Sequence, residues 1–85
     1  MNDRHIGKID FQILSPPEGR GNVLEFLDGH GDAFMEVNIN DADEMHVKFY
    51  HTSRHIVIPL AELEKGIALA KERVKNVDAA EFEGN

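Results

Sequence analysis

Hydrophobic and polar residues alternate in several short stretches of the chain before Pro59. The alternation is clearest in residues 33–39, where Met35 and Val37 fall on one side of an extended chain and Phe34 and Glu36 on the other. A period of two predicts half-buried β-strands. The stretches with this pattern are residues 6–14, 22–28, 33–39, 45–50 and 55–58.

Segments rich in glycine, proline, asparagine and aspartate separate these stretches. They include residues 15–21, 28–32 and 40–44, and all are short. A parallel crossover needs a longer connection, usually with a helix of its own. The short connections therefore predict an antiparallel meander of about five strands.

At Pro59 the hydrophobic period changes from two to the three-and-four spacing of an amphipathic helix. We expect this helix to span roughly residues 59–77, with Pro59 in its first turn, where the missing N–H costs nothing. Gly66 lies inside the helix, which suggests a close approach of helix to sheet. The apolar stripe consists of Leu60, Leu63, Ile67, Ala70, Val74 and Val77.

Together these elements predict an α+β fold, with the C-terminal helix packed on one face of the antiparallel sheet. Residues 1–77 form a single domain in this interpretation, and residues 78–85 a flexible acidic tail. The inward-facing strand residues expected under the helix are Ile9, Phe11, Ile13, Leu24, Phe26, Met35, Val37, Val47, Phe49, Ile56 and Ile58.

The composition narrows the classes of function. The chain of 85 residues contains no cysteine, which excludes disulfides and thiolate metal sites. Its N-terminus lacks the apolar segment of a secretory signal, and no apolar run is long enough to cross a bilayer, so we expect a cytoplasmic protein. The formal net charge of −7 argues against direct binding to nucleic acid or to an anionic membrane surface.

The negative charge is concentrated in one part of the chain. Residues 25–44 hold seven acidic side chains and no Lys or Arg, whereas the rest holds nine acidic and nine basic residues. A one-sign field of this kind can steer a basic protein partner. The outward face adds aromatic and polar residues typical of a protein-binding patch. The candidate partner-binding residues are Glu25, Asp28, Asp32, Glu36, Asp41, Asp43, Glu44, Phe34, His46 and Tyr50.

Catalytic and metal-binding motifs are weak by comparison. His51 and His55 bracket a short loop with Ser53, but the loop offers no group to orient a histidine and no third zinc ligand. The acidic turn at residues 28–32 lacks the bidentate glutamate of a calcium loop, since its twelfth position is Ile39. We therefore expect no enzymatic activity, no cofactor and no metal.

The sequence favours a small, non-catalytic protein-interaction module that binds a basic protein through its acidic strip. Inhibitors and immunity proteins that block basic nuclease toxins have this size and charge, an analogy that rests on no shared motif. One alternative is a structural or regulatory homodimer that pairs through an edge strand or an uncovered sheet face. A small metal-dependent module around His46, His51 and His55 ranks lower.

Overall fold

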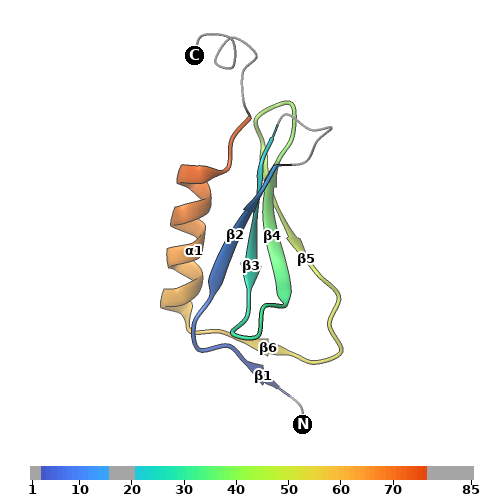
Figure 1. Ribbon diagram of the computed structural model, residues 1–85, viewed down its shortest axis with the longest axis vertical. Helices are drawn as coiled ribbons and strands as arrows, with labels where there is room; N and C mark the ends of the chain where they lie inside the picture. The colour runs from blue at the N-terminus through green and yellow to red at the C-terminus, as the bar shows by residue number, and fades with distance from the viewer. Residues whose placement is uncertain (1–2, 16–20, 77–85) are drawn as a thin grey trace.

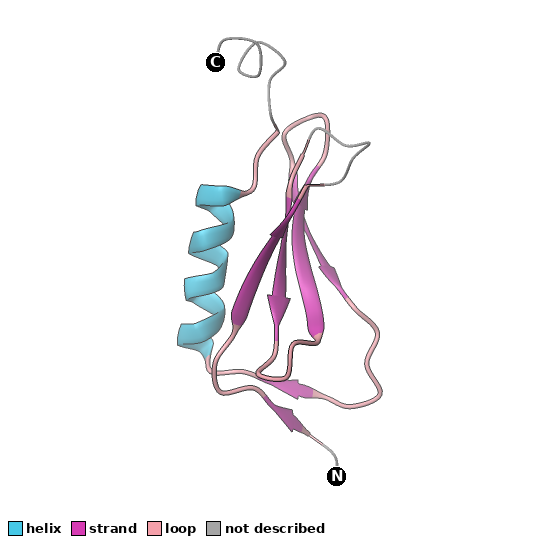
Figure 2. Ribbon diagram, viewed as in Figure 1, coloured by secondary structure: helices cyan, strands magenta, loops and turns pink. Residues whose placement is uncertain are grey.

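The computed structural model describes residues 3–15 and 21–76. It shows a four-stranded antiparallel sheet with one helix packed against it (Figures 1 and 2). This is the α+β class that the sequence predicts. The acidic tail predicted at residues 78–85 and the prolines of the first loop lie outside the described residues.

The sheet is a meander of strands adjacent in sequence. Its strands are β2 (Asp10–Leu14), β3 (Val23–Leu27), β4 (Ala33–Ile39) and β5 (Met45–Phe49), in the order β2-β3-β4-β5. All three pairings are antiparallel. The meander predicted for the middle of the chain is therefore confirmed, and β2 and β5 are its edges.

The predicted first and fifth strands behave differently from the rest. The stretch at residues 6–14 divides into β1 (Arg4–His5) and β2, and residues 55–58 form β6 (Ile56–Val57). These two short strands pair in parallel, Arg4 with Ile56 and His5 with Val57, at one end of the main sheet (Figure 1). The prediction that β6 continues the antiparallel meander is wrong. Short loops exclude parallel pairing only between sequence neighbours, and β1 and β6 lie far apart along the chain.

The helix α1 (Leu60–Arg73) starts where the period changes, with Pro59 just before its first residue. It ends earlier than predicted because Asn22 binds its C-terminus. The amide Nδ2 of Asn22 donates to the Arg73 carbonyl at 2.9 Å, and its Oδ1 accepts the Lys75 N–H at 2.8 Å. These bonds satisfy groups that a longer helix would have paired internally. Val74 is already in an extended conformation.

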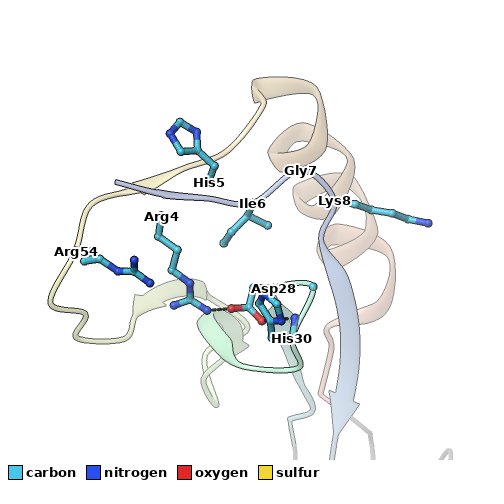
Figure 3. Close-up of a pocket in the computed structure, with 9 residues that line it drawn as sticks. Arg4, His5, Ile6, Gly7, Lys8, Asp28, His30 and Arg54 are labelled. Atoms are coloured by element: carbon cyan, nitrogen blue, oxygen red, sulfur yellow. Dashed lines mark hydrogen bonds and ion pairs between the residues drawn. The ribbon is translucent and has the colours of Figure 1, made fainter. Parts of the chain in front are cut away.

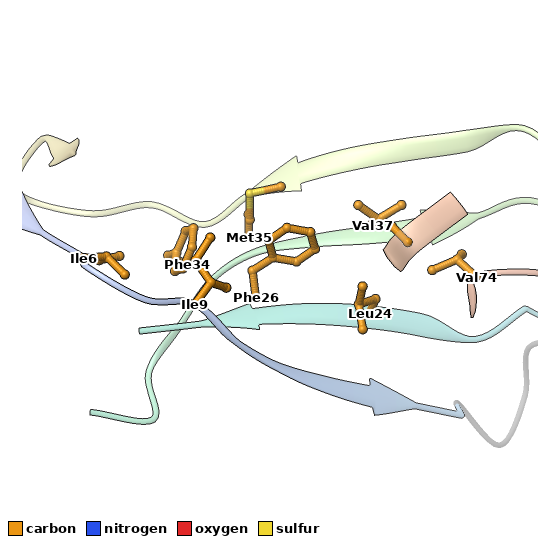
Figure 4. Close-up of a cluster of buried hydrophobic side chains, with 9 residues drawn as sticks. Ile6, Ile9, Leu24, Phe26, Phe34, Met35, Val37 and Val74 are labelled. Carbon is orange, nitrogen blue, oxygen red and sulfur yellow. The ribbon is translucent and has the colours of Figure 1, made fainter. Parts of the chain in front are cut away.

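The core lies between α1 and the β2–β3 side of the sheet. Phe26 contacts Phe11 edge-on, with ring centroids 5.2 Å apart. The buried apolar residues, drawn in Figure 4, are Ile6, Ile9, Leu24, Phe26, Phe34, Met35, Val37, Ala70 and Val74. The inward orientation predicted for Ile9, Leu24, Phe26, Met35 and Val37 is thus confirmed, and Phe11, Ile56 and Ile58 pack against this core.

One helix does not cover the whole inner face. Val47 is 50% exposed and Phe49 75% exposed on β5, and Ile13 on β2 is 44% exposed, so their predicted burial is wrong. Val47 and Phe49 lie on β5, farther across the sheet than the strip that a single helix over β2 and β3 can shield. On the helix itself, Leu60 and Ile67 are exposed although they belong to the apolar stripe.

A β-bulge changes the orientation of Phe34. Phe26 pairs with Met35, but the next residue, Leu27, pairs with Ala33, so Phe34 has no partner on β3. A bulged residue departs from strict side-chain alternation. Phe34 is accordingly buried, at 3% exposure, and its ring meets Phe26 edge-on at 6.4 Å. Its predicted place on the exposed outer face is wrong.

Among the described residues, no helix has the length and apolar character needed to cross a membrane.

Candidate functional site

The outer face of the sheet, opposite α1, carries a pair of facing glutamates. Glu25 on β3 and Glu36 on β4 are direct cross-strand partners, and both are partly buried. The hydroxyl of Tyr50 lies 2.8 Å from Glu25 Oε2 and 2.7 Å from Glu36 Oε1. Asn38 also donates its side-chain amide to Glu36 at 3.0 Å. The sequence predicts both glutamates as partner-binding residues, and the structure adds the tyrosine hydroxyl that joins them.

This cluster is short of positive charge. Like charges directly opposite each other on a sheet are unfavourable, and a phenol has only one hydrogen to donate between two carboxylates. Lys48 stands opposite Glu36 in the register, but no ion pair joins it to either glutamate in the described chain. Glu25 and Glu36 therefore retain acceptor capacity for a donor from outside.

The same cluster perturbs Tyr50. Partial burial of the hydroxyl, its hydrogen bonds to Glu36 and Glu25 and their negative charge raise the pKa of Tyr50 well above its ordinary value. The hydroxyl therefore stays protonated and serves as a hydrogen-bond donor to the carboxylates.

The turn between β4 and β5 gathers three more acidic side chains. Asn40 holds this turn, since its Oδ1 accepts the N–H groups of Ala42 at 2.9 Å and Glu44 at 3.0 Å. Asp43 takes a positive φ of 63° and accepts the Asn76 amide at 2.9 Å. Asp41, Asp43 and Glu44 are exposed, as the sequence predicts.

Asp28, at the other end of the strip, is not available to a partner. It is 2% exposed, and its Oδ1 accepts the backbone N–H groups of His30 at 2.8 Å and Asp32 at 2.9 Å. Its Oδ2 forms an ion pair with Arg4 from β1 (Figure 3). Of the two aspartates in this turn, only Asp32 is exposed, and its carboxylate lies 4.0 Å from the Arg4 guanidinium. Asp28 and Asp32, the carboxylates of the acidic turn considered for calcium, thus lie beside the guanidinium of Arg4.

A cavity of about 250 Å³ adjoins this ion pair, and its lining includes Arg4, His5, Lys8, His30 and Arg54 (Figure 3). Sequence reasoning missed this contact between the N-terminal strand and the β3–β4 turn. Arg4 and Asp28 are far apart in sequence, and neither belongs to a sequence motif that predicts an ion pair.

The histidine loop between β5 and β6 lies at the surface of the protein. His51, Ser53 and His55 are all exposed, and the imidazole Nδ1 of His55 lies 3.6 Å from an Asp3 carboxylate oxygen. His46 lies in β5, where its register partner on β4 is Asn38. Within residues 3–15 and 21–76, no group of three or more His, Cys, Asp or Glu side chains could hold a metal ion.

No protein-family model, curated protein or solved structure matches this chain. Its function must therefore be inferred from its own geometry.

Proposed function

We propose that the protein is a small, non-catalytic protein-interaction module whose outer sheet face binds a basic protein partner. The observation that carries this proposal is the Glu25–Tyr50–Glu36 cluster, in which two facing carboxylates share one hydroxyl. A guanidinium or ammonium group from a partner would bind both carboxylates and relieve their repulsion. Within this class, an inhibitor or immunity-type role fits the size and charge of the chain.

The surrounding charge supports the same proposal. All the net charge of the chain arises between residues 25 and 44, where no Lys or Arg interrupts the acidic residues. The exposed Asp41 and Glu44 lie in the turn at one end of β4, and Asp32 lies in the turn at the other. The field of these groups would accelerate association with a basic protein. Asp28 and Phe34 are no part of the proposed surface, because both are buried.

The test is affinity capture from the native cell, followed by titration of the captured partner with wild-type and variant protein. Glu25→Gln combined with Glu36→Gln should weaken binding about tenfold or more and reduce its dependence on salt. The matched control is Glu64→Gln with Glu72→Gln, which removes the same charge from exposed positions on α1. Equal affinity of the two double variants would contradict the proposal, because net charge alone would then account for binding.

A further inference from the structure

The outer edge of β5 has an ordered set of unpaired backbone groups. Tyr50 donates its N–H to the Phe34 carbonyl at 3.0 Å, and Asn40 donates to the Glu44 carbonyl at 3.1 Å. In an antiparallel ladder, residues that form backbone hydrogen bonds with the neighbouring strand alternate with residues that do not. The even-numbered residues of β5 therefore form these hydrogen bonds with β4. The N–H and C=O groups of Met45, Val47 and Phe49 therefore point away from the sheet. No strand in the described chain pairs with them.

The side chains of the same three residues form an exposed apolar row. Met45, Val47 and Phe49 lie on the inner face, opposite Ile39, Val37 and Met35 of β4. Their exposures are 41%, 50% and 75%, because α1 covers the other side of this face. Phe49 also borders an apolar groove of about 340 Å³ whose other lining residues are Phe34, Met35, Ile56, Ile58 and Leu63.

The usual protections of an edge strand are weak here. Edge strands commonly avoid pairing through a proline, a bulge or an inward-pointing charge. β5 contains no proline, its register with β4 is unbroken, and its only charged residue, Lys48, points to the outer face. The opposite edge strand, β2, differs because α1 packs against it, with the ring of Phe11 next to Gly66.

The charges at the two ends of β5 indicate which partner fits this edge. Asp41, Asp43 and Glu44 precede the strand, and His51 and Arg54 follow it. All five are exposed. An antiparallel second copy would place the acidic end of each β5 beside the basic end of the other. A parallel copy would place like charges together.

We infer that β5 is a self-association edge, to which the β5 strand of a second copy adds in antiparallel orientation with the two-fold axis at Val47. In this register Val47 faces Val47 of the second copy, and Met45 faces Phe49. The outward N–H and C=O groups of these residues then pair as hydrogen-bonded residues, and their side chains share the inner face. The apolar rows of the two copies become one.

The same register brings Asp43 opposite His51 of the second copy. An imidazole can donate a hydrogen bond to a carboxylate in either protonation state. On the outer face, His46 stands opposite Lys48 of the second copy. Within each copy, Glu36 is the register partner of Lys48. This inference uses only the edge of β5 and does not rest on the proposed function.

Sedimentation and light scattering of the full chain should show an equilibrium between the 9.6 kDa monomer and its dimer as concentration rises through the micromolar range. The informative variants are charge reversals outside the core. Asp41→Lys with Asp43→Lys makes both ends of the edge basic, and His51→Glu with Arg54→Glu makes both ends acidic. Each variant alone should dimerise at least about tenfold more weakly than wild type, and an equal mixture of the two should recover the affinity.

Amide hydrogen exchange provides a second readout. At high protein concentration the amides of Met45, Val47 and Phe49 should become protected, whereas those of His46 and Lys48 should be protected at every concentration. A monomer at all concentrations, a dimer unaffected by both charge variants, or a mixture that fails to recover pairing would each overturn the inference. Partner capture by the Glu25 and Glu36 variants is a separate measurement, so either proposal can fail alone.

Discussion

Gly66 in α1 lies directly against the ring of Phe26 in β3, with the ring of Phe11 beside it. A β-carbon at position 66 would overlap the Phe26 ring and stand 3.0 Å from Cε1 of Phe11. The two rings are in edge-on contact with each other, so neither can move aside without opening the core. The missing β-carbon therefore sets the distance between helix and sheet.

Gly66→Ala should destabilise the protein even though alanine is the better helix former. The gain in helix propensity is about 1 kcal/mol, whereas overpacking a filled core costs about 1–3 kcal/mol. We expect a net loss of free energy of unfolding, measured by urea denaturation. The control is Ala68→Gly, at an exposed helix position, which should cost only the propensity term of about 1 kcal/mol. A stabilised Gly66→Ala protein would show that the helix can shift outward freely.

Asp28→Asn should destabilise the fold by about 3 kcal/mol, because it leaves Arg4 opposite a neutral amide in place of a buried carboxylate. The expected loss is at the lower end for buried pairs because the Arg4 side chain is 22% exposed. Urea denaturation measures the change. Asp32→Asn is the matched control, since this exposed carboxylate lies 4.0 Å from the same guanidinium and should change stability by less than about 0.5 kcal/mol. Similar losses for the two variants would contradict the central role of Asp28.

Tyr50 should resist ionisation in alkaline solution. It is the only tyrosine of the chain, so the near-ultraviolet absorbance of tyrosinate reports on this residue alone. Its pKa is raised in the folded protein by burial, by its hydrogen bonds to Glu36 and Glu25 and by their charge, so the transition should fall above the ordinary value of about 10. Replacing both glutamates with glutamine should move the transition back toward that value.

The sign of the effect on stability follows from the raised pKa. Between the unfolded and folded pKa values of Tyr50, the folded state binds more protons than the unfolded state. The contribution of Tyr50 to stability is therefore complete below pH about 10 and is lost as the pH rises further. A tyrosinate transition at the ordinary pH, with the fold intact, would show that the hydroxyl is not held by the glutamates.

Glu62 should contribute to stability in mildly acidic solution through a contact between α1 and Ile9, the residue just before β2. Its carboxylate accepts the backbone N–H of Ile9 at 3.1 Å, and this bond lowers the pKa of Glu62 against the opposing effect of burial, with help from Lys65 and Lys8. The folded state thus releases its proton more readily, so the contribution is present above pH about 4.3 and is lost as the pH falls through the lower folded value.

The urea midpoint of the wild-type protein should therefore decrease more steeply below this pH than that of Glu62→Gln. Glu64→Gln, a neutralisation at an exposed position on the same helix, serves as the control and should follow the wild-type curve. Parallel curves for wild type and Glu62→Gln would contradict the predicted role of the Ile9 contact.

Local pattern was sufficient for elements that contact their sequence neighbours. The alternation in residues 33–39 gave β4 with its observed bounds, and the change of period at Pro59 located the start of α1. The acidic turn before β5 was also predicted as exposed, since Asn40 and the aspartates specify it locally. Glu25 and Glu36 share a face because strand alternation requires it, but the tyrosine between them depends on register.

Hydrophobicity could not identify which apolar residues the fold would bury. Val47 and Phe49 alternate like core residues and are exposed, because the helix covers the β2–β3 side of the sheet. Phe34 alternates like a surface residue and is buried, because the register shift between Phe26 and Leu27 leaves it unpaired. Both outcomes depend on contacts between segments, and no single stretch of sequence contains that information.

The sequence by itself determined the fold class, the approximate positions of the meander strands and the concentration of negative charge in residues 25–44, because each depends on residue spacing along the chain. Only the tertiary structure decided that Asp28 is enclosed by Arg4, that Tyr50 joins Glu25 and Glu36, and that the β5 edge stays open. The physical reason is that burial and pairing of a side chain depend on elements distant in sequence. A charged or apolar residue becomes a binding surface only where the rest of the fold leaves it uncovered.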